Sequence, residues 1–463
     1  MFSFLKGKQV AFTTGLIFLL SMSVYSQKPY LSLSELNDSA DRYWPRLMEK
    51  KAQLNSASVA VTETRHQFLP AFRFNDQVNL GSDNSIAGSY FPYGIVPSTS
   101  SGVRAENDYQ AASGNIAILY GQYDLVDFGY KNARIDYAKS EQSLSQSDLQ
   151  RELYLLHGRI CRAYFNLMIE EARMAVESET VKRYDTIFTI INALVKSGIK
   201  PGADSSLAKA ELSKSRITYN QLQEKAENYR EEIAYMTGIS PDHIFPDSVL
   251  MFTGKRKNIL GAPIDTGANP LLDYYANLSR IYVSNERLIA KSYLPKIMLT
   301  AASWARGSSI VYDDQYKGIP EGFGYQRFNY LVGLTFQYDL FNGLHKKDRL
   351  KTFGFEREAV ELEFKQQQLN LDHTTRQAQN SIDITEKNLL ELPVQYQSAV
   401  DTYNQKIAQY KAGINSLIDL TNAAFVLDRA LNDYAETTGN WYLAQLDKAI
   451  ATGNLTGFIK SIQ

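Results

Sequence analysis

Several features on which enzymes and disulfide-rich proteins depend are scarce in these 463 residues. The single cysteine, Cys161, excludes a disulfide framework and is typical of a small packed side chain in a helix. Neither a glycine-rich phosphate loop nor a nucleophile placed near a base can be found. The five histidines lack the spacing of metal ligands: they are His66, His157, His243, His345 and His373. We therefore predict no catalysis, no cofactor and no metal site.

Strong charge of one sign and long hydrophobic runs are also lacking. The formal net charge is −1, so nothing suggests a nucleic-acid partner. The apolar run at residues 10–20 is too short for a membrane-spanning helix, which needs about 20 residues. It follows Lys6 and Lys8 and precedes small or tolerated residues, as in a secretory signal peptide. We expect residues 1–26 to be removed before Gln27, and no cysteine follows that junction to carry a lipid anchor.

The chain instead contains a duplicated plan whose second copy lies about 215 residues after the first. The tripeptide Tyr-Asp-Leu occurs at 123–125 and again at 338–340, followed by Gly129 and Gly343. A long helical pattern comes next in both copies and closes at Gly198 and Gly413. An aspartate stands six residues after each closing glycine, Asp204 and Asp419. Such a repeat describes an architecture more than an active site.

The first structural repeat is expected to span residues 27–238. A helix at 35–68, capped at Ser34, should end at Leu69-Pro70. Alternating polarity then predicts strands at 71–81 and 114–125, separated by an exposed loop rich in glycine, serine and proline at 82–112. A long helix at 130–197 and a return helix at 203–236 complete the unit.

Residues 239–270 hold four prolines and are expected to form a linker before a second repeat at 271–451 and a C-terminal tail at 452–463. The second repeat should contain a helix ending at Leu294-Pro295, then strands at 296–305 and 329–340 around a loop at 306–327. A long helix at 344–412 and a return helix at 414–450 follow, and Pro393 should bend the long helix.

The lengths of these elements exclude an ordinary compact domain. A helix of this length extends about 100 Å at 1.5 Å per residue. Strands of roughly ten residues are long enough to cross a bilayer when they are tilted, but four strands cannot close a barrel. Because open strand edges are not tolerated in lipid, several copies of the chain should combine their strands.

The pattern resembles the TolC family of outer membrane efflux proteins over nearly the whole mature chain. The resemblance rests on the two Leu-Pro helix ends, on the Tyr-Asp-Leu strand ends with their glycines, and on the glycine-turn motif at residues 410–420. It implies a mainly α fold with a transmembrane β-barrel part. The family forms homotrimers with a shared twelve-stranded barrel in the outer membrane lipid and an α-helical tunnel in the periplasm. The resemblance also implies a periplasmic adaptor protein and an inner membrane pump as partners.

The resemblance further implies a gate at the periplasmic tip. Asp204 matches the acidic residue of the first hairpin, Tyr410 matches the tyrosine that hydrogen-bonds to it, and Asp419 matches an aspartate ring in the lumen. Asn415 stands where an arginine partner can occur, and Asn422 stands where a second aspartate ring can occur. Because both residues are neutral, we expect a tip that is less firmly closed and, with one aspartate ring fewer, less strongly blocked by cations. Asp204 could equally be a helix N-cap, whereas the deeper position of Asp419 in its helix favours the lumen.

Two functional hypotheses are compatible with this plan. The leading one is a passive exit duct for small molecules or exported polypeptides. The alternative is a structural or adhesive stalk that displays the loops at 82–112 and 306–327. Two matched hairpins that converge at one end favour the duct, because a stalk does not need them. An exported hydrolase has no supporting residues.

Overall fold

The computed structural model describes residues 32–86, 103–248, 250–253, 269–312 and 314–462. The expected signal peptide, most of the first loop and much of the expected linker lie outside these residues. The described chain forms two compact units. Unit 1 comprises residues 1–52, 147–275 and 363–463, and unit 2 comprises residues 53–146 and 276–362.

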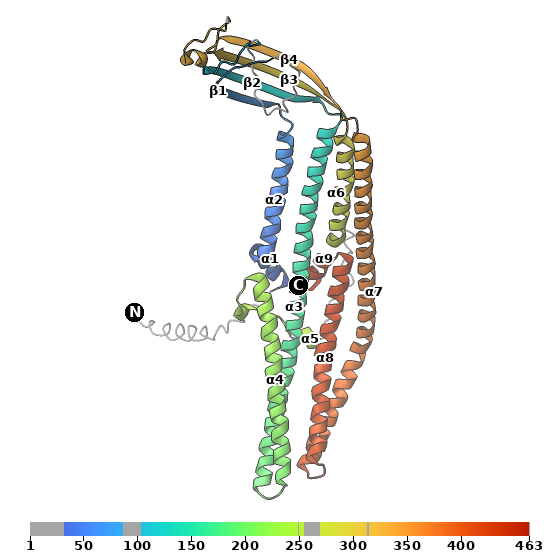
Figure 1. Cartoon of the computed structure of the whole chain (residues 1–463). Helices are drawn as coiled ribbons and strands as arrows, with labels where there is room; N and C mark the ends of the chain where they lie inside the picture. Colours follow the sequence, from blue (N-terminus) through green and yellow to red (C-terminus); the bar gives the residue numbers. More distant parts are fainter. Residues whose placement is uncertain (1–31, 87–102, 249, 254–268, 313, 463) are drawn as a thin grey trace, which may run out of the picture. The chain divides into compact units, whose positions relative to one another are not determined.

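Unit 2 contains one antiparallel sheet with the strand order β1-β2-β3-β4 (Figure 1). The strands are β1 (Ala71–Gly81), β2 (Ala112–Val126), β3 (Lys296–Ser308) and β4 (Arg327–Gln337). The central pair joins the two halves of the sequence, with Ala117 opposite Ala305, and a bulge interrupts β2 at its end. β1 and β4 are the edges, and each pairs with one strand in the described part of the chain.

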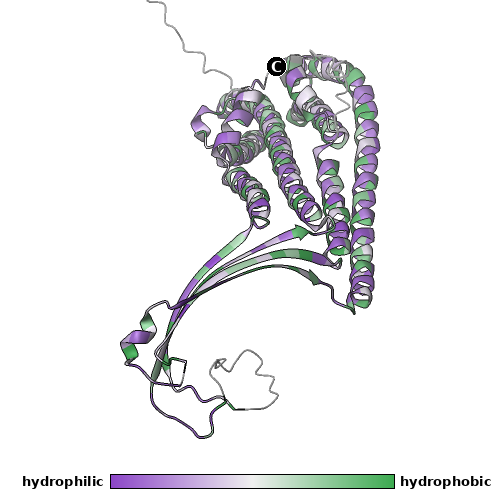
Figure 2. Cartoon of the chain, turned by 90° about the horizontal axis from the view of Figure 1, so that it is seen from above, coloured by the Kyte–Doolittle hydropathy of each residue, from purple (hydrophilic) through white to green (hydrophobic). Residues whose placement is uncertain are grey.

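The edge strands expose apolar side chains along their length. Phe72, Phe74, Val78 and Leu80 of β1 are 56–72% exposed. The apolar side chains of β4 are also largely exposed, and the most exposed of them is Tyr330, at 86%. Green and purple segments along the strands show how hydrophobic and polar residues share the sheet (Figure 2). Period-two alternation places one set of residues on each face, so one face of the chain's own sheet carries uncovered apolar area.

Unit 1 is helical, and parts of α2, α3, α6 and α7 belong to it. The helices of the chain are α1 (Leu33–Tyr43), α2 (Pro45–His66), α3 (Tyr130–Lys196), α4 (Gly202–Thr237), α5 (Leu250–Thr253), α6 (Pro270–Ser292), α7 (Asn342–Lys411), α8 (Leu417–Thr452) and α9 (Leu455–Ile462), together with the 3₁₀ turns η1 (Pro241–His243) and η3 (Ile319–Phe323). Among the described residues, no helix combines the length and the apolar character needed to cross a membrane.

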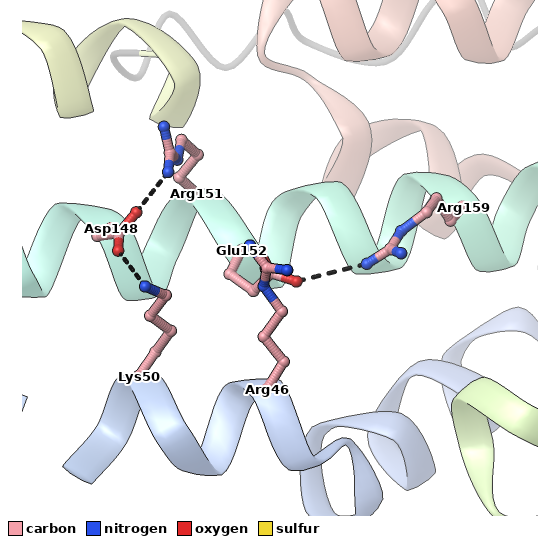
Figure 3. Close-up of polar contacts among 6 residues, drawn as sticks. All are labelled: Arg46, Lys50, Asp148, Arg151, Glu152 and Arg159. Atoms are coloured by element: carbon pink, nitrogen blue, oxygen red, sulfur yellow. Dashed lines mark hydrogen bonds and ion pairs between the residues drawn. The ribbon is translucent and has the colours of Figure 1, made fainter. Parts of the chain in front are cut away.

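Two ion-pair groups fix α2 against α3 within unit 1 (Figure 3). Asp148 lies between Lys50 and Arg151, at nitrogen–oxygen distances of 2.8 and 2.7 Å. The buried carboxylate of Glu152 contacts Arg46 at 3.1 Å and Arg159 at 3.4 Å. Burial makes these pairs sensitive to loss of either partner, because an unpaired charge would remain.

The structure corrects the expected first helix, which is two helices. Pro45 forces Trp44 into an extended backbone, with ψ of 113°, and thereby ends α1. The cap is Ser32 instead of Ser34, and it forms a capping box with Glu35.

Other bounds also differ from the expected ones. β4 ends at Gln337, so Tyr338-Asp339-Leu340 follow the strand, whereas Tyr123-Asp124-Leu125 lie within β2. The expected linker contains η1 and α5. The expected tail forms α9 after Gly453, which ends α8 at a φ of +83°. Buried Leu455, Phe458 and Ile459 hold α9 in place, because their apolar area is removed from water.

Candidate functional site

The two closing glycines occupy turns of the same geometry. Gly198 and Gly413 have φ of +73° and +76°, a region that glycine enters without steric cost. In each turn the N–H of the glycine donates to the carbonyl of the residue three positions earlier. The N–H of the residue after the glycine donates to the carbonyl of the residue five positions before it. The pairs are Gly198–Val195 and Ile199–Leu194 in one turn, and Gly413–Tyr410 and Ile414–Gln409 in the other. Each long helix therefore ends in a Schellman motif.

Both turns lie at the same end of unit 1 (Figure 1), where α3, α4, α7 and α8 share one hydrophobic core. Each helix contributes side chains to it. The buried members are Tyr184, Ile187, Ile191, Ala208, Leu212, Tyr410, Leu417, Leu420 and Ala424. We call this end of the unit the tip. The hairpins α3–α4 and α7–α8 thus form a packed four-helix body in a single chain.

Asp204 and Tyr410 come together in the tip. Tyr410 is 5% exposed, and its hydroxyl has no hydrogen-bond partner among the described residues. Burial raises the pKa of Tyr410, and the negative charge of Asp204 raises it further. The amine of Lys200 lies 5.3 Å from the centre of the Tyr410 ring. The expected neighbours are therefore close within one chain, but no hydrogen bond joins them.

The two aspartates have different local roles in the structure. The N-cap of α4 is Pro201, which makes no side-chain cap bond, so Asp204 lies in the first turn without being the cap. Asp419 forms a capping box with Ser416 at the start of α8. The hydrogen bonds from Ser416 hold the pKa of Asp419 below its usual value. Capping thus explains Asp419, although its carboxylate is still exposed.

The two asparagines of the predicted gate have different surroundings. Asn415 lies in the turn before α8, and its Nδ2 donates to Oε1 of Gln409 at 2.6 Å. Asn422 is exposed on α8, three residues after Asp419 and hence on a neighbouring position of the same helical face. Within the described ranges, no group of histidine, cysteine or acidic residues has the arrangement of a metal site.

Comparison with known proteins finds one family similarity. Residues 38–238 match the family model of the outer membrane efflux proteins. This match covers less than half of the chain and agrees with the predicted resemblance to the TolC family of outer membrane efflux proteins. No curated protein matches the chain.

Several solved outer membrane proteins have the same fold as this chain. The outer membrane protein VceC of Vibrio cholerae aligns with a TM-score of 0.72 at 14% identity, over 91% of this chain and 96% of its own. The CmeC outer membrane channel of Campylobacter jejuni gives 0.72 at 15% identity, over 91% and 86%. The outer-membrane channel OprN gives 0.71 at 15% identity, over 93% and 95%. The mainly helical body with one antiparallel sheet is therefore the fold of such channels.

Two features of unit 1 could not be predicted from the sequence. The first is a pair of acids on facing helices, Glu177 of α3 and Asp428 of α8. Glu177 accepts a hydrogen bond from Ser215 at 2.5 Å, and Asp428 accepts one from Thr180 at 2.6 Å. Burial raises the pKa of both carboxyl groups, and the charge of Asp428 raises that of Glu177 further.

The second feature is a cavity of about 230 Å³ between α3 and α7. Glu177 and Asp428 resembled ordinary solvated charges in the sequence, and the cavity residues resembled a packing seam. No local pattern could have distinguished them, since both depend on which helix faces meet.

Proposed function

We propose that this protein is the outer membrane exit duct of a tripartite efflux or type I secretion system. It would act as a passive conduit for small molecules or polypeptides, gated at the periplasmic end of its helices. The observation that carries the proposal is the pair of matched Schellman turns, which bring two hairpins into one core beside Asp204 and Tyr410.

Assembly is supported by the edges of the sheet. β1 and β4 carry apolar side chains that are largely exposed, and each has a free edge in the described part of the chain. Free backbone N–H and C=O groups cost several kcal/mol each in hydrocarbon. We therefore propose that three copies contribute four strands each to a barrel in outer membrane lipid. The helices of the homotrimer would extend into the periplasm.

The gate is proposed from the unsatisfied hydroxyl of Tyr410. A buried hydroxyl without a partner costs about 1–3 kcal/mol, so a partner from a neighbouring copy would favour the closed assembly. Asp204 and Asp419 would place negative charge near the opening. Asn415 and Asn422 would contribute no charge, which predicts a weaker closure and a weaker block by cations than charged residues would give.

Transport through such a duct needs energy from other proteins. The matched family model is that of outer membrane efflux proteins, and OprN, which has the same fold, is an outer-membrane channel. We propose a periplasmic adaptor and an inner membrane pump as partners, with the tip as the end that meets them.

Single-channel recording of the purified protein in a planar bilayer tests the duct. We expect small, cation-preferring currents that rise in Asp204→Asn and Tyr410→Phe. Asp419→Ala should also raise the current, but it removes a capping bond as well as a charge. Ser416→Ala is the matched control, because it weakens the same cap and keeps the carboxylate. Equal effects of Asp419→Ala and Ser416→Ala would assign the change to the cap.

The absence of current under all conditions would instead favour the stalk. In that case the surface loops, and not a conduit, would be the functional part of the chain.

A further inference from the structure

The cavity between α3 and α7 has an apolar floor. Ile187 of α3, Tyr403, Ile407 and Tyr410 of α7, and Leu420 of α8 form it. Ile187, Tyr410 and Leu420 are buried members of the tip core. All of these residues belong to unit 1, so the cavity is formed within one compact body. Its volume of about 230 Å³ suits a small organic molecule better than a drug-sized one.

Two residues that line this cavity each carry a buried polar atom without a partner among the described residues. One is the Tyr410 hydroxyl, on a side chain that is 5% exposed. The other is Nε of Arg183, while the terminal nitrogen of the same guanidinium donates to Thr180 at 2.5 Å. Buried donors are normally satisfied, so two orphaned donors in one cavity point to a ligand that accepts hydrogen bonds.

The charged residues at the cavity are mostly cationic. Lys182, Arg183 and Lys411 line it, and Glu179 is the acidic lining residue. Glu179 is paired with Lys182 at 2.7 Å, which leaves two cations in excess. Behind Arg183, the acids Glu177 and Asp428 partly offset its charge. Near Tyr410, the amine of Lys200 approaches the ring, and Asp204 adds one negative charge to the surroundings of the hydroxyl.

We propose that this cavity binds a small amphipathic carboxylate, with its hydrocarbon part on the isoleucine and tyrosine floor and its carboxylate at Arg183 and Lys411. A carboxylate accepts hydrogen bonds without donating them, so it would accept from Nε of Arg183 and would compete with a neighbouring copy for the Tyr410 hydroxyl. An amine would meet the cationic rim and leave the same donors unsatisfied. A strongly hydrated anion such as phosphate would gain nothing from the apolar floor.

Such a ligand would connect α3 of one hairpin to α7 of the other. The proposal goes beyond the exit duct, because it gives the tip an effector site that needs no transported cargo. Binding can also be measured without current, so its failure and the failure of the duct are separate results.

The test uses the full-length protein in lipid nanodiscs and three radiolabelled probes in equilibrium dialysis, with empty nanodiscs subtracted. The probes are 3-phenylpropanoate, 3-phenylpropan-1-ol and 3-phenylpropylamine, which share one hydrocarbon part and differ in the head group. We expect saturable binding of the carboxylate at one site per chain, at least tenfold tighter than that of the amine. Equal binding of carboxylate and amine would overturn the proposal, as would no saturable binding of the carboxylate.

Variants then locate the site. Thr186 lines the cavity and is exposed, so Thr186→Trp should obstruct the cavity and weaken carboxylate binding at least tenfold. Tyr410→Phe keeps the ring and should weaken carboxylate binding several-fold. This variant serves as a second test if Thr186→Trp does not fold. The matched control is Lys209→Gln, which removes an exposed cation of α4 outside the cavity and should leave binding unchanged. Full binding in both Thr186→Trp and Tyr410→Phe would place the ligand elsewhere.

Discussion

Ser416 and Asp419 hold the start of α8 through reciprocal hydrogen bonds. The Asp419 carboxylate accepts from the backbone N–H and the hydroxyl of Ser416, at 3.2 and 2.7 Å. The Ser416 hydroxyl accepts from the backbone N–H of Asp419 at 3.2 Å. One residue of the proposed gate thus also stabilises the helix that carries it, and mutations there must separate the two roles.

The first prediction concerns this cap. Ser416→Ala should destabilise the first turn of α8 by about 1 kcal/mol, because one of the free N–H groups of the helix loses its acceptor. Amide hydrogen exchange at residues 417–420 should then be about fivefold faster. In Asp419→Asn the acceptor oxygen remains and the charge is lost, so exchange should change less. An unchanged exchange rate in Ser416→Ala would show that the cap does not limit opening of this turn.

The acidity of Asp419 adds a pH dependence. The pKa of Asp419 is lowered in the folded protein. The stability that its ionised carboxylate contributes is therefore present above the usual carboxyl pKa and is lost as the pH falls through the lowered pKa. The cap should therefore weaken only in acid.

A second prediction concerns the closing glycines. Gly198→Ala and Gly413→Ala should each cost about 1–2 kcal/mol, because alanine must adopt the left-handed region. Hydrogen exchange near each turn measures the change. Gly202→Ala is the control: a methyl group there meets nothing within 4 Å, and the residue begins α4 without a positive φ. A cost at Gly202 equal to that at Gly198 would contradict the backbone argument.

A third prediction concerns the contact between α3 and α8. A Cβ at Gly439 would overlap the side chain of Ile169, so Gly439→Ala should destabilise the protein by about 1–3 kcal/mol. Thermal unfolding by circular dichroism is the measurement, and Ile169→Ala should partly restore stability when combined with it. Gly354→Ala, where the methyl group has open space, should stabilise α7 by up to about 1 kcal/mol. If Gly439→Ala were as stable as Gly354→Ala, the close approach of the helices would be wrong.

A fourth prediction concerns Glu177 and Asp428. Their pKa values are raised in the folded state, so folding takes up protons and stability increases as the pH falls toward the usual carboxyl pKa. The double variant Glu177→Gln and Asp428→Asn keeps acceptor oxygens for Ser215 and Thr180 but carries no charge.

The melting temperature of the double variant should exceed that of the wild type near pH 7.5, by about 1 °C for each kcal/mol gained in a chain of 463 residues. The difference should shrink toward pH 5, because the wild-type acids then take up protons. Arg173 and Arg183 face these acids and oppose the gain, so a wild type that is more stable at every pH would mean that the ion pairs outweigh burial. Glu224→Gln, at an exposed acid of α4, should show neither effect.

Much of the architecture was predictable because it depends on local rules. The closing glycines, the Leu-Pro helix ends and period-two alternation located the turns, strands and long helices to within a few residues. The errors also have local physical causes. Pro45 divides the first helix at Trp44, and β4 lacks a paired neighbour beyond Gln337, so the second Tyr-Asp-Leu lies outside the sheet.

The sequence by itself determined where the chain turns and which residues are apolar, since backbone sterics and hydrophobic periodicity act over a few residues. Only the tertiary structure decided that Asp419 caps a helix while Asp204 approaches Tyr410. The cavity and the buried acid pair were likewise decided there, because they arise where α3, α7 and α8 meet. Burial and unsatisfied donors are properties of packed faces, and residues more than 200 positions apart in the chain create those faces.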